Sequence, residues 1–209
     1  MTLDNKKFNL ILGLVIAYGV GVNVLTCALL NSVEFTNTMT IVTCVVAFVL
    51  GIGGIFVAQS NKPSMSFLGY NMLVIPFGVM LSTTVRLYEP HIVLEAFVIT
   101  FLIMLLMITV SSMFPDVFKN MGVVLFIVLC GLIVAYLAFY LLGINTLVLS
   151  WISAGLFSLY IGYDWVVAQS GPKTLDAAID AALGIYLDIV NLFLDLLRIL
   201  GRQTIDNTN

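Results

Sequence analysis

Seven apolar runs, each about as long as a membrane-spanning helix, constrain the fold of this 209-residue chain more than any other feature. The hydrocarbon core of a bilayer requires about 20 apolar residues in a helix, and the runs lack the two-residue alternation of membrane β-barrel strands. We expect spans at 8–30, 39–58, 67–85, 93–113, 121–142, 147–169 and 176–200. The sequence therefore predicts an all-α polytopic membrane protein, with residues 1–209 forming a single seven-span membrane domain.

The composition supports this class and excludes a soluble protein. Apolar residues make up 61% of the chain and charged residues only 9%, whereas a soluble domain carries about 25% charged residues. The net charge of -3 comes without a basic cluster, so the chain offers no surface for nucleic-acid phosphates. We expect a lipid bilayer, and not nucleic acid, as its surroundings.

Basic residues are distributed unevenly between the two sides of the predicted topology. Because Lys and Arg favour cytoplasmic loops, the side that carries more of them is expected to be cytoplasmic. One side carries Lys6, Lys7, Lys62, Lys119 and Lys173, and the other carries Arg86, Arg202 and, counted at the interface, Arg198. We therefore expect a cytoplasmic N-terminus and an external C-terminus. The short loops are compatible with a bacterial plasma membrane, without excluding an organelle.

Small residues recur at four-residue intervals in two of the spans. Such spacing lets neighbouring helices approach closely within a membrane. The first span carries Gly13, Ala17 and Gly21, and the sixth carries Ser150, Ala154, Ser158 and Gly162. We expect both stripes to lie at helix–helix contacts.

The net charge is concentrated in the last part of the chain. Residues 1–163 contain five acids and five bases, whereas residues 164–209 contain six acids and three bases. On a helix that advances about 100° per residue, the polar side chains of the last span fall within a sector of about 120°. A lipid-facing helix would not tolerate such a stripe. We therefore predict that the last span lies at the centre of the bundle, with its stripe facing the bundle interior or a water-filled path.

Two aspartates in the last two spans are expected at the same depth in the membrane. With a rise of about 1.5 Å per residue, Asp164 and Asp188 differ in depth by only about 3 Å. Each aspartate costs roughly 2.5–3.5 kcal/mol within a membrane, and two adjacent carboxyl groups should share a proton. The pair is thus a candidate proton-sensitive latch or cation site; the alternative is that each carboxyl bonds backbone or hydroxyl groups between helices.

Other residues of the polar stripe are weaker candidates. Asp195 is followed by Arg198 three residues later, so a structural ion pair is at least as well supported as a cation-binding role. Asp180 and Asn191 share the stripe and are candidate accessory residues of the path. The single histidine, His91, cannot form a zinc site, and we expect no cofactor.

The last two predicted spans also carry a family resemblance. Residues 180–200, with the sequence DAALGIYLDIVNLFLDLLRIL, together with Tyr163-Asp164, resemble the transmembrane Bax inhibitor motif family, in particular bacterial members that form pH-sensitive calcium leaks. The resemblance implies a seven-helix fold with a central last helix. It also implies that Asp164 and Asp188 form the proton-sensitive couple, with calcium and protons as ligands.

The chain departs from the family pattern in two places. Family members carry a basic residue in span two near the paired acids, whereas span two here has no charge before Lys62. Gln59, Asn61 or Lys62 are the available, weaker substitutes. Asp195 stands where an uncharged residue is expected, which adds a possible second acidic ring to the path.

A pH-sensitive calcium or cation leak channel is the leading functional hypothesis, with Asp164 and Asp188 as gate and calcium ligands, because hard cations prefer oxygen. A proton-coupled cation or small-solute transporter is the alternative, although such carriers often show inverted repeats and this sequence shows no evident repeat.

An intramembrane aspartyl protease would need Gly-x-Gly-Asp, whereas this chain has Gly184-Ile-Tyr-Leu-Asp188. We therefore expect that the protein is not an enzyme. A scaffold for membrane partners remains a further alternative, and the sequence names no protein partner.

Overall fold

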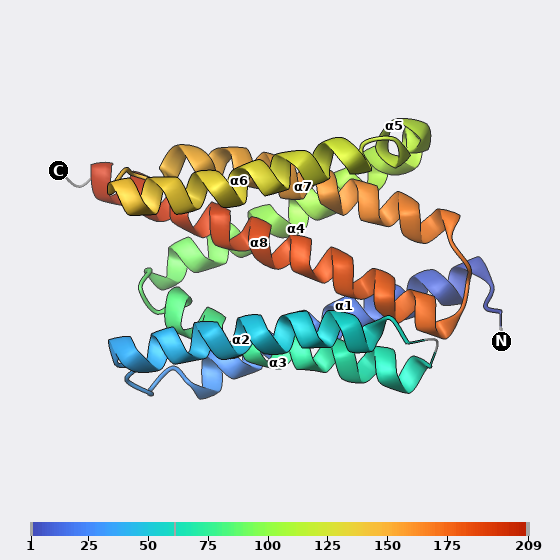
Figure 1. The fold of residues 1–209 in the computed structure, drawn as a ribbon, viewed down its shortest axis with the longest axis horizontal. Helices are drawn as coiled ribbons and strands as arrows, with labels where there is room; N and C mark the ends of the chain where they lie inside the picture. Colours follow the sequence, from blue (N-terminus) through green and yellow to red (C-terminus); the bar gives the residue numbers. More distant parts are fainter. Residues whose placement is uncertain (1, 61, 208–209) are drawn as a thin grey trace. The chain divides into compact units, whose positions relative to one another are not determined.

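The chain folds into α-helices joined by short loops (Figure 1). The structure is a computed structural model that describes residues 2–60 and 62–207, with side chains described as far as Arg202. Within these residues the helices are α1 (Asn5–Leu29), α2 (Asn37–Ala58), α3 (Pro63–Val85), α4 (Pro90–Met113), α5 (Pro115–Lys119), α6 (Gly122–Leu142), α7 (Leu147–Ser170) and α8 (Leu175–Asn207). The described part contains no strand, only an isolated bridge between Thr2 and Thr174.

Seven of the described helices, all except α5, are long and apolar enough to cross a membrane. This confirms the predicted all-α polytopic class and the seven spans. The predicted span starts are late where a proline opens the helix: α3 begins at Pro63 and not at 67, and α4 begins at Pro90 and not at 93. Proline at the first helical position has a suitable fixed φ and needs no N–H partner. Polar residues that were assigned to loops therefore form the first helical turns.

The described helices pack as two compact units. The first, Met1–Leu87 with Gly171–Tyr186, contains α1, α2, α3 and the start of α8; the second, Tyr88–Ser170 with Leu187–Asn209, contains α4 to α7 and the rest of α8. The prediction of a single domain stays a prediction. In α8, 61% of its most apolar window is buried, against 11–39% in the other six spans, as expected for a helix with a polar stripe.

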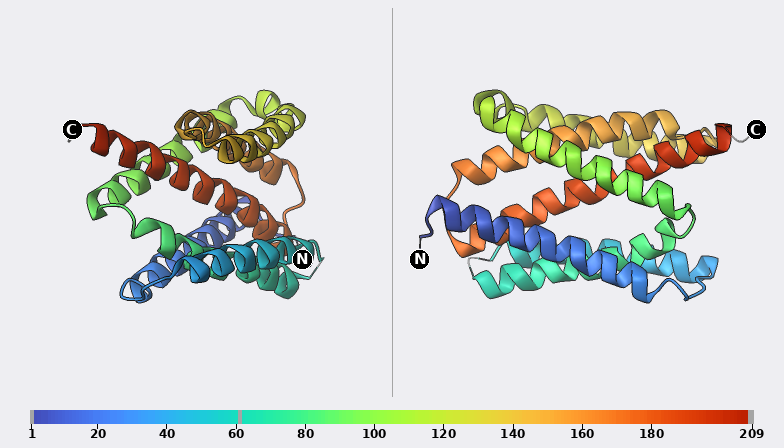
Figure 2. Two further views of the ribbon diagram at one scale, coloured as in Figure 1. Left: turned by 60° about the vertical axis from the view of Figure 1, so that its left-hand side comes forward. Right: turned by 180° about the vertical axis from the view of Figure 1, so that it is seen from behind.

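In the first unit, α3 lies beside both α1 and α2 (Figure 2). The two helices approach closely at Gly54 of α2 and Gly69 of α3: a Cβ atom on Gly54 would lie 2.5 Å from the Gly69 carbonyl oxygen. Only glycine at both positions permits this contact. The backbones of α2 and α3 thus approach closely at these glycines, a feature that the spacing of small residues in the sequence did not indicate.

The predicted small-residue contacts are correct for the sixth span and wrong for the first. In α7, Ser150, Ala154 and Gly162 are buried, and Gly162 packs against the Phe118 ring of α5. In α1, by contrast, Gly13 and Gly21 are exposed with nothing packed on them. A four-residue spacing defines one face of a helix but not whether another helix covers it.

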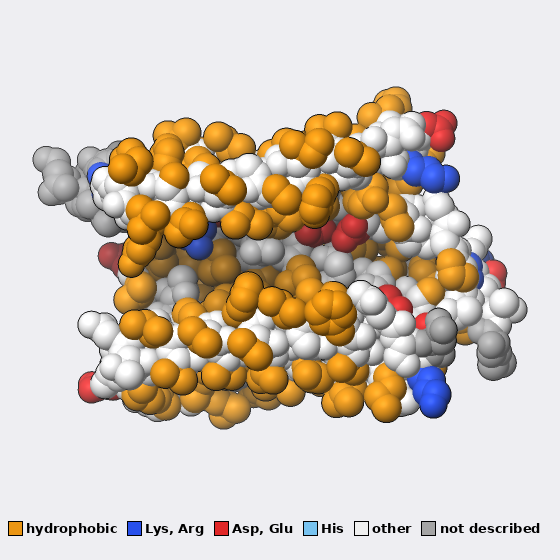
Figure 3. All heavy atoms as spheres, in the orientation of Figure 1, with side chains coloured by type: hydrophobic (Ala, Val, Ile, Leu, Met, Phe, Trp, Pro, Cys, Tyr) orange, Lys and Arg blue, Asp and Glu red, His pale blue; other side chains and the backbone are white. Residues whose placement is uncertain are grey.

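On the face that Figure 3 shows, apolar side chains cover most of α2 and α6, and few charged side chains lie on these two helices. Large exposed apolar residues include Phe48 and Phe56 on α2 and Phe126 and Ile133 on α6. Soluble monomers rarely expose contiguous apolar patches larger than a few hundred Å². This surface suits contact with lipid tails and supports an integral, multi-pass membrane protein.

Candidate functional site

The structure brings Asp164 of α7 and Asp188 of α8 together within the second unit. Their carboxyl groups lie close enough to interact electrostatically. Asp188 is only 6% exposed, and its Oδ2 atom meets no hydrogen-bond partner among the described groups. Because an ionised carboxyl only accepts hydrogen bonds, a bond between the two groups requires a proton on one of them.

Two contacts beside Asp164 hold this part of α7 in place. The Tyr163 ring packs on the backbone of Gly122 in α6, where a Cβ atom would lie 2.6 Å from the phenol oxygen. On the other side, the indole N–H of Trp165 donates to the hydroxyl of Ser112 in α4 at 2.9 Å. The residues before and after Asp164 are thus anchored on two different helices, which fixes its depth and direction.

Tyr160 is a neighbour of the pair that the sequence analysis missed. It lies one helical turn before Asp164 and close enough to both carboxyl groups to interact with them electrostatically. Its ring packs edge-on against Tyr163, with centroids 6.3 Å apart. The signal in the sequence was the four-residue spacing between Tyr160 and Asp164, which places both on one helix face.

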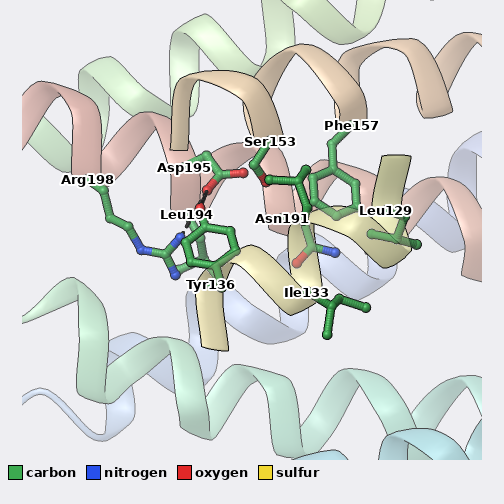
Figure 4. A pocket seen from close by; sticks show the side chains of 10 residues that line it. Leu129, Ile133, Tyr136, Ser153, Phe157, Asn191, Leu194, Asp195 and Arg198 are labelled. Carbon is green, nitrogen blue, oxygen red and sulfur yellow. Dashed lines mark hydrogen bonds and ion pairs between the residues drawn. The ribbon is translucent and has the colours of Figure 1, made fainter. Parts of the chain in front are cut away.

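Asp195 occupies a different environment in the same unit. It is 2% exposed and accepts hydrogen bonds from Arg198 Nη1 at 2.9 Å and from the Tyr136 hydroxyl at 3.4 Å. The Ser153 side chain also bonds to it. Figure 4 shows these side chains converging from α6, α7 and α8 at a cavity of about 240 Å³. The predicted ion pair is therefore present, and the Asp195 carboxylate has donors on three helices.

Asn191 and Asp180 do not join the Asp164–Asp188 pair in one described cluster. Asn191 lines the cavity beside Asp195, and its amide donates to the Leu187 carbonyl of its own helix at 2.8 Å. Asp180 belongs to the first unit, where its side chain lies close to Ser66 of α3. The Ser66 hydroxyl donates to Asp176 at 2.7 Å. A hydroxyl group of α3 thus contacts the acidic first part of α8.

The possible substitutes for a basic residue in the second span lie after α2. Gln59 and Lys62 are exposed, and Asn61 lies outside the described residues. Among the described side chains, no three or more His, Cys, Asp or Glu residues gather closely enough to hold a metal ion. A cation at Asp164 and Asp188 would therefore have two carboxyl groups and other oxygen ligands, such as water.

Residues 7–204 of the chain match the family described as "Inhibitor of apoptosis-promoting Bax1". The chain belongs to this family. The match includes both aspartates of the pair, all seven spans in part or whole, and the segment 163–200 on which the resemblance rested.

Individual relatives match shorter stretches. The chain is 43% identical over 84 residues to an uncharacterized protein of Helicobacter pylori, covering 39% of this chain and 36% of that protein. It is 42% identical over 85 residues to an uncharacterized protein of Campylobacter jejuni, covering 40% and 36%. It is 33% identical over 127 residues to the Golgi anti-apoptotic protein of Vaccinia virus, covering 59% and 52%. The chain thus spans about a third to a half of these relatives' lengths.

Proposed function

We propose that this protein is a pH-sensitive cation leak channel that passes calcium and is gated by the Asp164–Asp188 pair. One observation carries the proposal: two aspartates from consecutive spans lie close enough to interact, and one of them is buried with an oxygen atom that has no donor among the described groups. Intramembrane acids of this kind typically mark ion or proton pathways. Membership of the family supports the same reading.

The gate works through a single proton. When one carboxyl is protonated, it donates to the other, and the bond holds α7 and α8 together at this depth. When the proton leaves, two adjacent carboxylates repel each other strongly because the surroundings have a low dielectric constant. The bond is lost, and the freed oxygen atoms suit a hard divalent cation. Calcium flux should therefore rise as pH rises and fall as pH falls.

The proposal includes a location and an orientation. The protein would lie in a bacterial plasma membrane. Its N-terminus would be cytoplasmic and its C-terminus external, because most of the lysines lie on the same side of the predicted topology as the N-terminus. Calcium is the transported ion and not a resident cofactor. No catalytic step is part of this function.

Calcium flux into dye-loaded proteoliposomes, measured across about pH 6 to 8, tests the gate. We expect Asp164→Asn and Asp188→Asn each to change the flux and to flatten its pH response, because neither variant can exchange the shared proton. Asp116→Asn, an exposed position in the first turn of α5, is the matched control and should behave like the wild type.

Three outcomes would contradict the proposal. Wild-type flux and pH profile in both aspartate variants would eliminate the gate. Saturable flux coupled to a fixed number of protons would indicate a transporter. Cleavage of a membrane peptide that depends on both aspartates would indicate a protease.

A further inference from the structure

A second cavity, of about 700 Å³, lies in the first unit where the α1–α2 loop, the start of α2 and the end of α3 meet. Its wall carries both signs of charge, from Glu34 and Arg86, and also polar and apolar side chains such as Thr40, Phe35 and Ile41. A cavity of this size is within the range of small-molecule binding sites. The mixture of charge and apolar surface suits an amphipathic ligand.

Arg86 is held in place by the loop that it faces. Its Nη1 atom donates to the Val33 carbonyl, and its guanidinium lies 5.5 Å from the centre of the Phe35 ring. A guanidinium carries five N–H donors in a planar fork that matches phosphate oxygens. The backbone contact leaves donors for a ligand, and the ring contact orients them.

Glu34 and Arg86 line the same cavity without neutralising each other. The described ion pairs join His91 to Glu89 and Arg198 to Asp195, and neither involves Glu34 or Arg86. Glu34 is exposed. Two opposite charges that share a cavity wall without pairing are complementary to a ligand that itself carries both charges: an anion for Arg86 and a hydrogen-bonding cation for Glu34.

The cavity lies at the ends of three candidate membrane spans, α1, α2 and α3. Span ends lie in the interfacial region of a bilayer, where lipid head groups reside. From Ile41 onward, α2 presents exposed apolar residues, including Val42 and Val45. This surface continues from the cavity toward the membrane interior and offers a path for an acyl chain.

We propose that this cavity binds a zwitterionic phospholipid with a primary ammonium group, the chemistry of phosphatidylethanolamine. The phosphate is bound by Arg86, the ammonium donates to the Glu34 carboxylate, and an acyl chain follows α2 from Ile41. The site does not depend on the proposed channel activity, because it uses none of the residues of the gate.

Lipid titration of the purified full-length protein by native mass spectrometry tests the site, with phosphatidylethanolamine, phosphatidylglycerol and phosphatidylcholine of identical acyl chains. The wild type should bind phosphatidylethanolamine about tenfold more tightly than either other lipid, since only its ammonium makes a charged hydrogen bond to Glu34. Glu34→Gln should remove this preference. Glu89→Gln, at an exposed acid that follows Arg86 closely in the sequence but does not line the cavity, is the matched control and should retain it.

Arg86 variants separate the phosphate contact from the ammonium contact. Arg86→Gln should weaken binding of all three lipids, because all three carry the phosphate, and Arg86→Lys should recover part of the loss. Equal affinity of the wild type for the three lipids, or equal behaviour of Glu34→Gln and Glu89→Gln, would refute the site. Displacement of the lipid by an equal concentration of free phosphoethanolamine would show a soluble ligand and overturn the assignment to a lipid.

Discussion

Asp188 and Asp195 lie seven residues apart on α8, in the same unit, and both are buried, at 6% and 2% exposure. Their partners are opposite in kind. Asp188 meets a second carboxyl, from Asp164, whereas Asp195 meets the guanidinium of Arg198 and two hydroxyl groups. One helix thus carries two buried aspartates in two different electrostatic environments.

The difference shows how two buried acids on one membrane helix can have different roles, one in the stability of the fold and the other in a response to pH. A basic partner favours the charged form of a buried acid, so their contact can be a fixed part of the packing. A buried acid with an acidic partner is held only through a proton, so its contact depends on the surrounding pH. Substitutions at the two positions should therefore change different measured quantities.

The largest expected effect concerns the pH response of calcium flux. A gate that loses one proton can change its open population by up to about tenfold per pH unit. Asp188→Asn should flatten that dependence, because the remaining Asp164 carboxyl then has no acidic partner with which to share a proton, whereas Asp195→Asn should leave the slope unchanged. Flux in proteoliposomes at a series of pH values measures both slopes. If Asp195→Asn flattens the profile to the same extent, the two sites are not distinct.

The next largest effect concerns stability at the ion pair. Arg198→Leu leaves the Asp195 carboxylate buried without its cation, a change that costs about 3–5 kcal/mol in fully buried pairs. Because the Arg198 side chain is 44% exposed, we expect a smaller loss, about 2–3 kcal/mol. Replacing both residues by leucine should recover most of the loss. Unfolding in mixed detergent micelles measures each free energy; a double variant no more stable than Arg198→Leu would argue against the pair.

A smaller loss of stability is expected at the contact that anchors Tyr163. Gly122→Ala places a methyl group against the Tyr163 ring, and overpacking of this kind costs about 1–3 kcal/mol. Gly131→Ala, on the same helix with open space around it, is the control and should be neutral or slightly stabilising. The same unfolding assay compares them. Because Tyr163 precedes Asp164, Gly122→Ala should also alter the pH profile, which Gly131→Ala should not.

The smallest effect is expected from the hydroxyl partner of Asp195. Tyr136→Phe removes a long hydrogen bond of 3.4 Å while Arg198 and Ser153 remain, so the loss should be about 0.5–1 kcal/mol.

Tyr160→Phe, beside the carboxyl pair, should instead change the pH profile of flux with little change in stability. Equal effects of the two substitutions on both measurements would remove the contrast between the sites.

Much of the fold could be predicted from the sequence because membrane spans have a characteristic length and composition. The seven spans were recovered, and the pairing of Asp164 with Asp188 followed from the rise per residue along two consecutive helices. The Asp195–Arg198 ion pair followed from a three-residue spacing. In each case the relevant geometry is local, or depends only on depth in the membrane.

Contacts between spans could not be predicted in the same way. The close approach of Gly54 and Gly69 depends on which faces of α2 and α3 meet, and the exposed Gly13 and Gly21 show that spacing does not supply this information. Helix α5 was assigned to a loop because its five residues are too few to show a periodic pattern. Tyr160 was missed because an aromatic residue in an apolar span does not stand out by composition.

The position of α8 in the chain has a consequence for biosynthesis. Both compact units include part of α8, and α8 follows the other described helices in the order of synthesis. Neither unit can assemble its described helices before the ribosome has passed Leu175. The earlier spans are therefore inserted into the membrane before α8 is available to pack with them. A message truncated before this point would yield two incomplete units, and membrane quality control would encounter both defects in the same chain.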